Sequence, residues 1–237
     1  MIVASRVDIA SMNMASFLRD VYFVDEELIE VKDLPVADYY IFLSRHEAKA
    51  KLPTLTAHFP GNFGPAEVGG NSNELGVAFP SLHKNFLLNL WELRDKVPGF
   101  EIVTEPTHHG PTHFDRPVLF VEIGSTVDEW TNKTAGKVMA DAVRKTIEDT
   151  RKWPAGIAFG GPHYSEKFTK FIIEDEIALG HIMPKYALSY LDEEMFKQMI
   201  AKSVEKIKYC VIDWKGCKKR REIKAMAEER GLEVIRL

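Results

Sequence analysis

Two short segments of the chain bring histidines and a carboxylate within a few residues of one another. The first is THHGPT at 107–112 and the second is FVEIGST at 120–126. Imidazoles titrate near neutral pH and bind zinc, and carboxylates also bind zinc and move protons. Two adjacent imidazoles cannot both face one core, so we expect His108 or His109 to take part in chemistry. The pattern indicates a zinc site or a general acid–base site.

The carboxylate in the second segment interrupts an apolar run. Residues 118–123 (VLFVEI) read as a buried strand, and Gly124 with the hydroxyl residues after it is typical of a strand end. A buried charge without a partner is costly, so Glu122 must be paired, protonated or metal-bound. Because ligands gather at strand ends in α/β proteins, Glu122 is the strongest carboxylate candidate.

Further histidines stand at predicted strand ends or beside glycine. His58 ends an apolar run, His163 follows a glycine-glycine-proline turn, and His181 follows a glycine. Strand ends that are far apart in sequence can converge in space, so this group also suggests zinc or acid–base chemistry. The HExxH zinc motif is absent. His83 lies inside a predicted helix, and we assign it a structural role.

A lysine near the end of the predicted strand 178–182 is a further candidate. Lys185 could hold a phosphate or a carboxylate as a point charge, and it could equally be an exposed lysine of a loop. Glu67 and Glu74 could approach the same site from a glycine-rich loop. No GxSxG motif is present, which disfavours a serine hydrolase.

Alternating apolar runs and helical patterns must position these residues. The predicted strands are 1–5, 39–43, 54–58, 100–103, 118–123, 156–159, 178–182, 209–212 and 232–235, and the predicted helices are 8–19, 81–96, 131–150, 192–206 and 218–229. Strands that alternate with helices predict an α/β sheet covered on both faces. Since no linker or low-complexity tract interrupts the alternation, we expect a single α/β domain over residues 1–237.

The longest irregular stretch runs over residues 59–80 and contains five glycines. A compact domain rarely carries so long a loop without a function, so we expect it to form one wall of the site. Backbone N–H groups of its 61–70 part could bind an oxyanion. Neither a phosphate-loop motif nor a dinucleotide-binding motif is present.

Composition limits the class of protein. The chain has 237 residues, 45% of them hydrophobic and 28% charged, as expected for a soluble globular protein. The N-terminus does not resemble a signal peptide and no apolar stretch reaches membrane-spanning length, so we expect a cytoplasmic protein without a membrane partner. Two cysteines exclude a disulfide framework and a paired-cysteine zinc site, and we expect both to be reduced.

Charge is distributed unevenly along the chain. The net charge is −4, yet residues 202–224 carry nine basic against three acidic side chains. This basic segment is either a solvated helix face or a contact surface for phosphates.

Taken in order, the motifs resemble those of one known family. They are Ser44-Arg45-His46, LTAH at 55–58 with Gly61-Asn62, Gly69-Gly70, THHGPT, FVEIGST with Trp130, GGPHY at 160–164 and GHIMPKY at 180–186. This order resembles the D-aminoacyl-tRNA deacylases of archaea and plants, and the resemblance covers essentially the whole chain. It implies a zinc-dependent cytoplasmic hydrolase with a three-layer α/β/α fold and a mostly parallel or mixed sheet, similar to the phosphorylase/peptidyl-tRNA hydrolase group.

The resemblance also implies a reaction: hydrolysis of the ester between a D-amino acid and the 3′-terminal ribose of tRNA, in translation quality control. Combined with the residues above, it predicts zinc bound by a subset of the histidines and Glu122, with the basic segment holding the tRNA acceptor end. A monomer is the simplest oligomeric state. The predicted metal ligands are His58, His108, His109, Glu122 and His163, and the predicted catalytic residues are His108, His109, Glu122, His163 and Lys185.

Three other classes of protein stay open. A zinc-dependent exopeptidase would share the fold and the histidine–carboxylate chemistry but would not need the basic segment. A nucleoside phosphorylase-like enzyme would turn over with phosphate and without metal. A non-catalytic RNA-binding protein would bind tRNA whether or not His108 and His109 were replaced.

Overall fold

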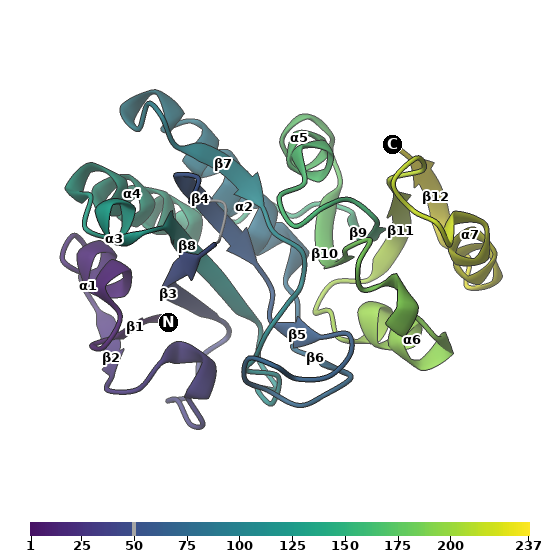
Figure 1. The fold of residues 1–237 in the computed structure, drawn as a ribbon, viewed down its shortest axis with the longest axis horizontal. Coiled ribbons are helices and arrows are strands. Elements are labelled where there is room, and N and C mark those ends of the chain that lie inside the picture. Colours follow the sequence, from purple (N-terminus) through teal and green to yellow (C-terminus); the bar gives the residue numbers. More distant parts are fainter. Residues whose placement is uncertain (49–50) are drawn as a thin grey trace.

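The computed structural model describes residues 1–48 and 51–237, which build two main β-sheets with helices packed against them (Figure 1). The larger sheet has the strand order β2-β1-β3-β8-β4-β7. Its strands are β1 (Ile2–Ser5), β2 (Val21–Val24), β3 (Tyr40–Glu47), β4 (Thr54–His58), β7 (Glu101–Thr104) and β8 (Val118–Ser125). Strand β4 runs antiparallel to β8, whereas the other neighbours run parallel, so this sheet is mixed.

The smaller sheet is entirely parallel, with the order β10-β9-β11-β12. Its strands are β9 (Ala155–Phe159), β10 (Ala178–Met183), β11 (Ile207–Ile212) and β12 (Glu233–Arg236). The glycine-rich stretch between β4 and the next helix contains a short antiparallel pair, β5 (Gly61–Asn62) and β6 (Glu74–Leu75).

Helices cover both sheets. They are α1 (Ile9–Ala15), α2 (Pro80–Trp91), α3 (Val127–Trp130), α4 (Lys133–Glu148), α5 (Glu166–Glu174), α6 (Glu193–Ala201) and α7 (Arg220–Glu229), with short 3-10 turns at Leu28–Glu30, Arg94–Lys96 and Leu188–Tyr190. None of the helices in the described ranges is long and apolar enough to cross a membrane.

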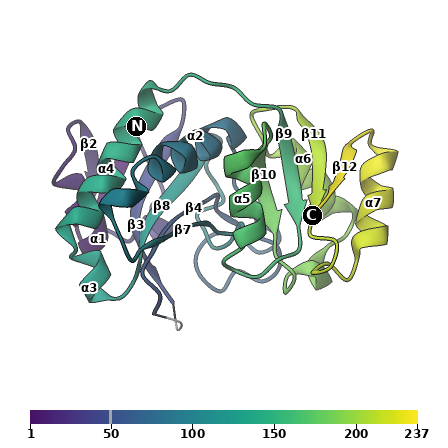
Figure 2. The ribbon, with the colours of Figure 1, turned by 90° about the horizontal axis from the view of Figure 1, so that it is seen from above.

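Helix α2 joins the two sheets into one packed structure. It contacts β4 and β7 of the larger sheet and β9 and β10 of the smaller one (Figure 2). Its buried Leu82, Phe86 and Leu90 recur at the three- and four-residue spacing of an apolar helix face. They belong to a hydrophobic cluster that contains residues of both sheets, such as Val121 and Leu179.

The layers around the smaller sheet are complete. Helix α5 packs on one face through Phe168 and Ile172, and helices α6 and α7 pack on the other through Phe196 and Ile223. This arrangement is consistent with the predicted three-layer α/β/α fold. On the larger sheet, α1, α2 and α4 cover one face, while the other is covered by irregular segments that contribute Leu28, Val31 and Phe114 among others.

The predicted strands are all present. The structure differs from the prediction in the number of sheets and in the ends of some helices. The sequence pattern predicts one sheet, but the strands divide into two because α2 and α5 pack between them. Strands β2, β5 and β6 and helices α3 and α5 are not among the predicted elements. The predicted helices 192–206 and 81–96 end earlier, at Ala201 and Trp91, where the chain turns toward β11 and into a 3-10 turn. The single domain over residues 1–237 stays a prediction.

The register places Glu122 in the centre of the larger sheet. Glu122 on β8 lies between Ser44 on β3 and Thr56 on β4, and His58 ends β4 opposite Phe120. The carboxyl ends of β7, β9 and β10 lie on the same side of the molecule, and the segments that follow these strands start there. Side chains from both sheets are therefore brought to one place.

Candidate active site and metal-binding cluster

A cavity of about 1440 Å³ opens where strand ends of the two sheets meet. The glycine-rich stretch contributes a wall that includes Gly61, Phe63 and Val68, as the length of that loop predicted. The residues that line it include His46, His108, His109, Glu122 and His163.

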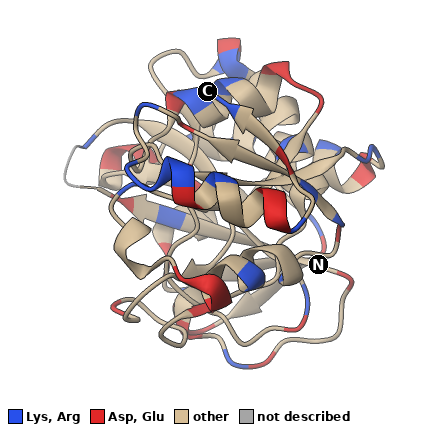
Figure 3. Cartoon of the chain, turned by 90° about the vertical axis from the view of Figure 1, so that its right-hand side faces the viewer, with Lys and Arg blue, Asp and Glu red and all other residues tan. Residues whose placement is uncertain are grey.

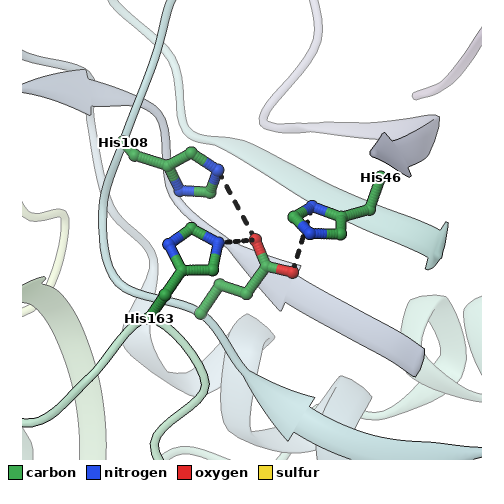
Figure 4. Close-up of side chains that lie close together, drawn as sticks. His46, His108 and His163 are labelled. Carbon is green, nitrogen blue, oxygen red and sulfur yellow. Dashed lines mark ion pairs between the residues drawn. The ribbon is translucent and has the colours of Figure 1, made fainter. Parts of the chain in front are cut away.

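Glu105 is the centre of the histidine cluster. Its Oε2 atom lies 3.5 Å from Nε2 of His108, 3.4 Å from Nε2 of His163 and 3.7 Å from Nδ1 of His58. Its other oxygen, Oε1, lies 3.3 Å from Nδ1 of His46. Figure 4 shows His46, His108 and His163 directed toward one carboxylate from three sides. A side chain that directly follows β7 thus gathers imidazoles from four separate segments.

Glu122 lies beside this centre. Its Oε2 atom is 3.3 Å from Nδ1 of His46 and 4.0 Å from Nδ1 of His58. Both glutamates are almost completely buried. Two carboxylates and several imidazoles therefore share a small volume from which solvent is largely excluded.

Backbone contacts fix how two of the histidines present their ring nitrogens. His108 Nδ1 lies 2.8 Å from the carbonyl oxygen of Pro106, and His109 Nδ1 lies 2.6 Å from that of Gly110. A carbonyl oxygen only accepts, so each Nδ1 carries the proton. In the neutral ring, Nε2 then presents a lone pair, which is the form that binds a metal ion.

The tautomer of His109 determines that of His58. Their Nε2 atoms are 3.1 Å apart, and since His109 Nε2 accepts, His58 Nε2 must donate. Neutral His58 therefore turns the Nδ1 lone pair toward Oε2 of Glu105 and Glu122. Three electron-rich atoms face one another, an arrangement that only a cation or added protons can stabilise.

Unsatisfied buried atoms indicate the same requirement. Nδ1 of His58, both oxygens of Glu105 and Oε2 of Glu122 have no hydrogen-bond partner among residues 1–48 and 51–237. Buried polar groups are rarely left in this state, and such a set of nitrogen and oxygen donors suits a zinc ion. The donors therefore fit a metal ion.

Within the described residues, three overlapping groups of side chains offer ligand atoms that lie within 4.8 Å of one another. They are His46, Glu105, His108 and His163; His58, His108 and His109; and His58, Glu105 and Glu122. His58, Glu105 and His108 each belong to two of these groups, so these three residues are central to any metal site here.

Burial and mutual repulsion control the ionisation of the cluster. Burial lowers the pKa of His58 and His108, and the charges of neighbouring histidines lower it further. Although burial opposes the imidazolium, contact with Glu122 and the charge of Glu105 raise the pKa of His46 to about 9. Burial thus disfavours the charged form of His58 and His108, whereas the neighbouring carboxylates favour the charged form of His46.

The two glutamates shift in opposite directions. Burial would raise the pKa of Glu105, but contact with His163 and the charges of His46 and His108 hold it well below its usual range. Burial raises the pKa of Glu122, and the charge of Glu105 raises it further, against the effect of His46. A pair of carboxyl groups whose pKa values are pushed apart is typical of sites that move protons.

Two tyrosines hold the outer histidines. The Tyr164 hydroxyl lies 2.7 Å from Nε2 of His46, and the Tyr186 hydroxyl lies 3.1 Å from Nδ1 of His163. Contacts of this kind orient metal ligands and fix their tautomers.

The structure brings together all five predicted metal ligands: His58, His108, His109, Glu122 and His163. Lys185 is exposed and is not among the residues that line the cavity. His83 is buried between Leu179 and Thr104, as its structural assignment predicted.

Other candidates have different places. His181 is buried against backbone carbonyls and Thr107. Glu67 lines the cavity, whereas Glu74 accepts hydrogen bonds from Thr112 and Asn71. The Gly61 N–H, offered as an oxyanion donor, instead donates to the carbonyl of His109 at 2.7 Å. Both cysteines are free and buried, as expected.

Sequence reasoning missed His46 and Glu105 as site residues. Both carried a signal: His46 stands near the end of β3, in the Ser44-Arg45-His46 motif, and Glu105 directly follows β7. Glu105 also lies two residues before the THHGPT segment. Its central position depends on the packing of β7 beside β4, which the sequence pattern did not predict.

Comparison with known proteins gives one consistent result. Residues 34–235 match the family model described as D-aminoacyl-tRNA deacylase. The chain is 42% identical over 205 residues to a D-aminoacyl-tRNA deacylase of Thermococcus onnurineus, covering 85% of this chain and 74% of the relative. It is 38% identical over 257 residues to one of Methanocaldococcus jannaschii, covering 100% of this chain and 99% of the relative.

A solved structure has the same fold. The crystal structure of a conserved protein of unknown function matches with a TM-score of 0.91 and 29% sequence identity, over 99% of this chain and 94% of that chain. The similarity therefore extends over both sheets and over the cavity between them.

Proposed function

Because the chain belongs to the D-aminoacyl-tRNA deacylase family, we propose that the histidine cavity is the place where it hydrolyses the ester of D-aminoacyl-tRNA. An enzyme of this family is a hydrolase that acts on the ester bond between the amino acid and tRNA. The products are the free D-amino acid and tRNA. We expect the protein to work in the cytoplasm, where aminoacyl-tRNA is used.

One observation supports the placement above all others. Several imidazoles and two buried carboxylates of opposite pKa shift converge on the large cavity where the two sheets meet. Ester hydrolysis needs an activated water, a group that moves a proton and a place for the leaving ribose oxygen. The cluster contains groups for the first two requirements.

We further propose that the metal is zinc. His46, Glu105, His108 and His163 are the best set of ligands, because they supply three nitrogens and one oxygen within 4.8 Å. His58, His109 and Glu122 lie next to this set and belong to the overlapping groups. When bound, zinc would lower the pKa of a bound water and polarise the ester carbonyl.

The remaining chemistry falls to side chains of the chain itself. Oε2 of Glu122 can take a proton and later return it to the ribose oxygen, because burial raises its pKa above that of an ordinary carboxylic acid. His108 and His109 are held in one tautomer by backbone carbonyls, so neither needs to reorganise during the reaction. Since Lys185 does not line the cavity, we do not assign it a catalytic step.

The basic segment 202–224 divides into two parts in the structure. Lys202 and Lys206 precede β11, whereas the part 215–221 follows it. The six residues of β11 separate these parts by roughly 20 Å at the usual rise per residue. We therefore propose that only the part 215–221 contacts the tRNA acceptor end.

The choice follows from the direction of the strands. Strand β11 pairs parallel with β9, so the carboxyl ends of both strands lie at the same end of the sheet. Residues 215–221, which follow β11, therefore lie at the same end of the sheet as His163, which follows β9. Figure 3 shows Lys and Arg gathered at the start of α7 and in the segment before it. The basic residues of this part are Lys215, Lys218, Lys219, Arg220 and Arg221.

The test is hydrolysis of matched D- and L-tyrosyl-tRNA by the purified protein, with chelator and with zinc added back. We expect cleavage of the D-ester alone, lost on chelation and restored by zinc. If neither ester is cleaved while zinc is present, the deacylase proposal is wrong and peptide substrates of a zinc exopeptidase become the next test. Cleavage that resists chelation would remove zinc from the proposal and leave the esterase in place.

A further inference from the structure

Two tyrosines stand at the rim of the cavity with much of their rings in solvent. Tyr186 is 57% exposed and Tyr190 is 47% exposed, although both line the same cavity as His163. Tyr186 precedes the 3-10 turn Leu188–Tyr190, and Tyr190 ends it. Large aromatic side chains that are exposed beside a functional cavity are candidates for contact with a ligand.

Each ring is positioned by a specific contact. The Tyr186 hydroxyl lies 3.1 Å from Nδ1 of His163, so this ring starts at the histidine cluster. The Tyr190 ring lies against the backbone of Gly64, where an added Cβ would come within 2.7 Å of the ring. The missing side chain at position 64 therefore lets the Tyr190 ring pack against the glycine-rich wall.

A hydrogen bond joins the residue after Tyr190 to the basic segment. The Lys219 ammonium donates to the carbonyl oxygen of Leu191 at 3.2 Å, and Leu191 directly follows Tyr190. Going outward from His163, the order of residues is therefore Tyr186, Tyr190 and then the basic residues that begin at Lys215. In this order the aromatic rings lie closer to the histidine cluster than the positive charges.

We propose that Tyr186 and Tyr190 stack on the unpaired CCA nucleotides at the 3′ end of the tRNA substrate. This inference rests on the proposed function, since it assigns residues that would guide the ester to the histidine cluster. Unpaired RNA bases are bound by stacking on aromatic rings, and the paired stem that follows is held through its phosphates. The order of aromatic and basic residues outward from His163 matches the order of unpaired and paired nucleotides in the acceptor end.

The position of the rings argues against binding of the amino-acid side chain. That side chain lies on the far side of the ester from the nucleotides, so it is expected inside the cavity once the ester reaches the cluster. Tyr186 and Tyr190 lie at the rim, between the cluster and the basic segment. Only the nucleotide side of the substrate must pass this point.

The experiment measures binding without hydrolysis. Uncharged tRNA and the same tRNA lacking its CCA end are titrated against the full-length protein, and the ratio of the two dissociation constants is compared between variants. We expect the wild type to bind intact tRNA more tightly. Tyr186→Leu and Tyr190→Leu should each reduce this preference by about 5- to 150-fold, the range for loss of one stacked base.

Matched variants separate stacking from other effects. Tyr186→Phe keeps the ring and loses the hydroxyl contact with His163, so it should keep the preference for the CCA end. Tyr22→Leu removes a similarly exposed ring on β2, outside the cavity lining, and should leave binding of both RNAs unchanged. Circular dichroism and thermal unfolding confirm that each variant is folded.

Two results would overturn the inference. One is a preference for the CCA end that survives both leucine substitutions, and the other is a wild type that shows no such preference. A loss of preference in Tyr186→Phe equal to that in Tyr186→Leu would also contradict stacking, because it would assign the effect to the hydroxyl. Deacylation of D-tyrosyl-tRNA by the wild type is measured in parallel, so that failure of the proposed function is seen separately.

Discussion

The Nδ1 atom of His58 lies 3.7 Å from Oε2 of Glu105, and neither atom has a hydrogen-bond partner in the part of the chain that the structure describes. Both atoms are deeply buried, and the tautomer imposed by His109 leaves a lone pair on this nitrogen. Burying a lone pair beside a carboxylate is unfavourable unless a cation lies between or beside them. The fold therefore maintains a repulsive arrangement that metal binding would relieve.

The first prediction is that Glu105→Gln weakens metal binding and reduces the stabilisation that the metal provides. The substitution replaces a charged carboxylate, shared by two of the three ligand groups, with a neutral amide that binds a metal ion more weakly. We expect zinc affinity to fall by at least about 10-fold, by analogy with the effect of replacing supporting residues of metal sites. The measurement is zinc content by mass spectrometry after dialysis against a graded metal buffer.

Thermal unfolding supplies a second readout for this variant. Ligand binding to the native state stabilises it, so chelation should lower the Tm of the wild type. The Tm of Glu105→Gln should change less on chelation. Glu67→Gln, at the cavity rim, is the matched control and should behave like the wild type. Equal zinc content in all three proteins would show that Glu105 is not a ligand.

The second prediction separates proton transfer from metal binding. Glu122→Gln keeps the size of the side chain and removes its ability to carry a proton, so kcat should fall by roughly 10²- to 10⁴-fold. Because Glu122 is outside the preferred set of ligands, zinc content should stay near that of the wild type. The measurement pairs single-turnover deacylation with zinc analysis of the same sample. A variant that loses zinc and activity together would move Glu122 into the ligand set.

Much of this site could be predicted from single residues, because each carried a local signal. Glu122 is polar within an apolar strand, and His108 and His109 are adjacent, so no packing role explains them fully. The signals at His46 and Glu105 were weaker, a strand end and a position just before a histidine motif. Their importance arises from the register of β3 on β8 and from β7 packing on β4, which are long-range pairings.

For the fold as well, local features could be predicted from the sequence, whereas contacts between distant elements could not. The pattern of α2 predicted a buried face, but not that the face would contact two different sheets. Strands and helices alternate along the chain in the same way whether the strands form one sheet or two, so the sequence pattern cannot give the number of sheets. The short edge strand β2 was missed because a four-residue run between charged segments carries little periodicity.

The third prediction concerns pH and stability. Burial lowers the pKa of both His83 and His181 to about 4 in the folded protein, although hydrogen bonds to backbone carbonyls oppose it. The unfolded chain binds a proton on each ring below about pH 6.5. The unfolded state therefore holds more protons between these pH values, and the free energy of unfolding falls as pH falls from about 6.5 to 4.

Each buried histidine should contribute on the order of 3 kcal/mol to this decrease. Urea unfolding at a series of pH values measures it. His83→Gln should show a smaller decrease over the same window, even if its stability at neutral pH is lower. The exposed His113 is the control, and His113→Gln should leave the slope unchanged. Parallel curves for all three proteins would mean that His83 is protonated in the folded state.

The fourth prediction tests which part of the basic segment binds tRNA. Lys215, Lys218 and Arg221 are exposed at the carboxyl end of β11, and Lys206 and Lys208 are exposed near its amino end. Alanine at the first three positions should weaken tRNA binding and reduce the slope of log affinity against log salt, by up to about 0.9 for each phosphate that is no longer neutralised. Alanine at Lys206 and Lys208 should leave the slope unchanged.

Binding to a set of tRNAs at several salt concentrations measures both the affinity and the slope. Because phosphates carry no sequence information, the weakening should be uniform across the set. A larger change of slope from Lys206 and Lys208 would place the acceptor stem at the opposite edge of the sheet, away from the histidine cluster.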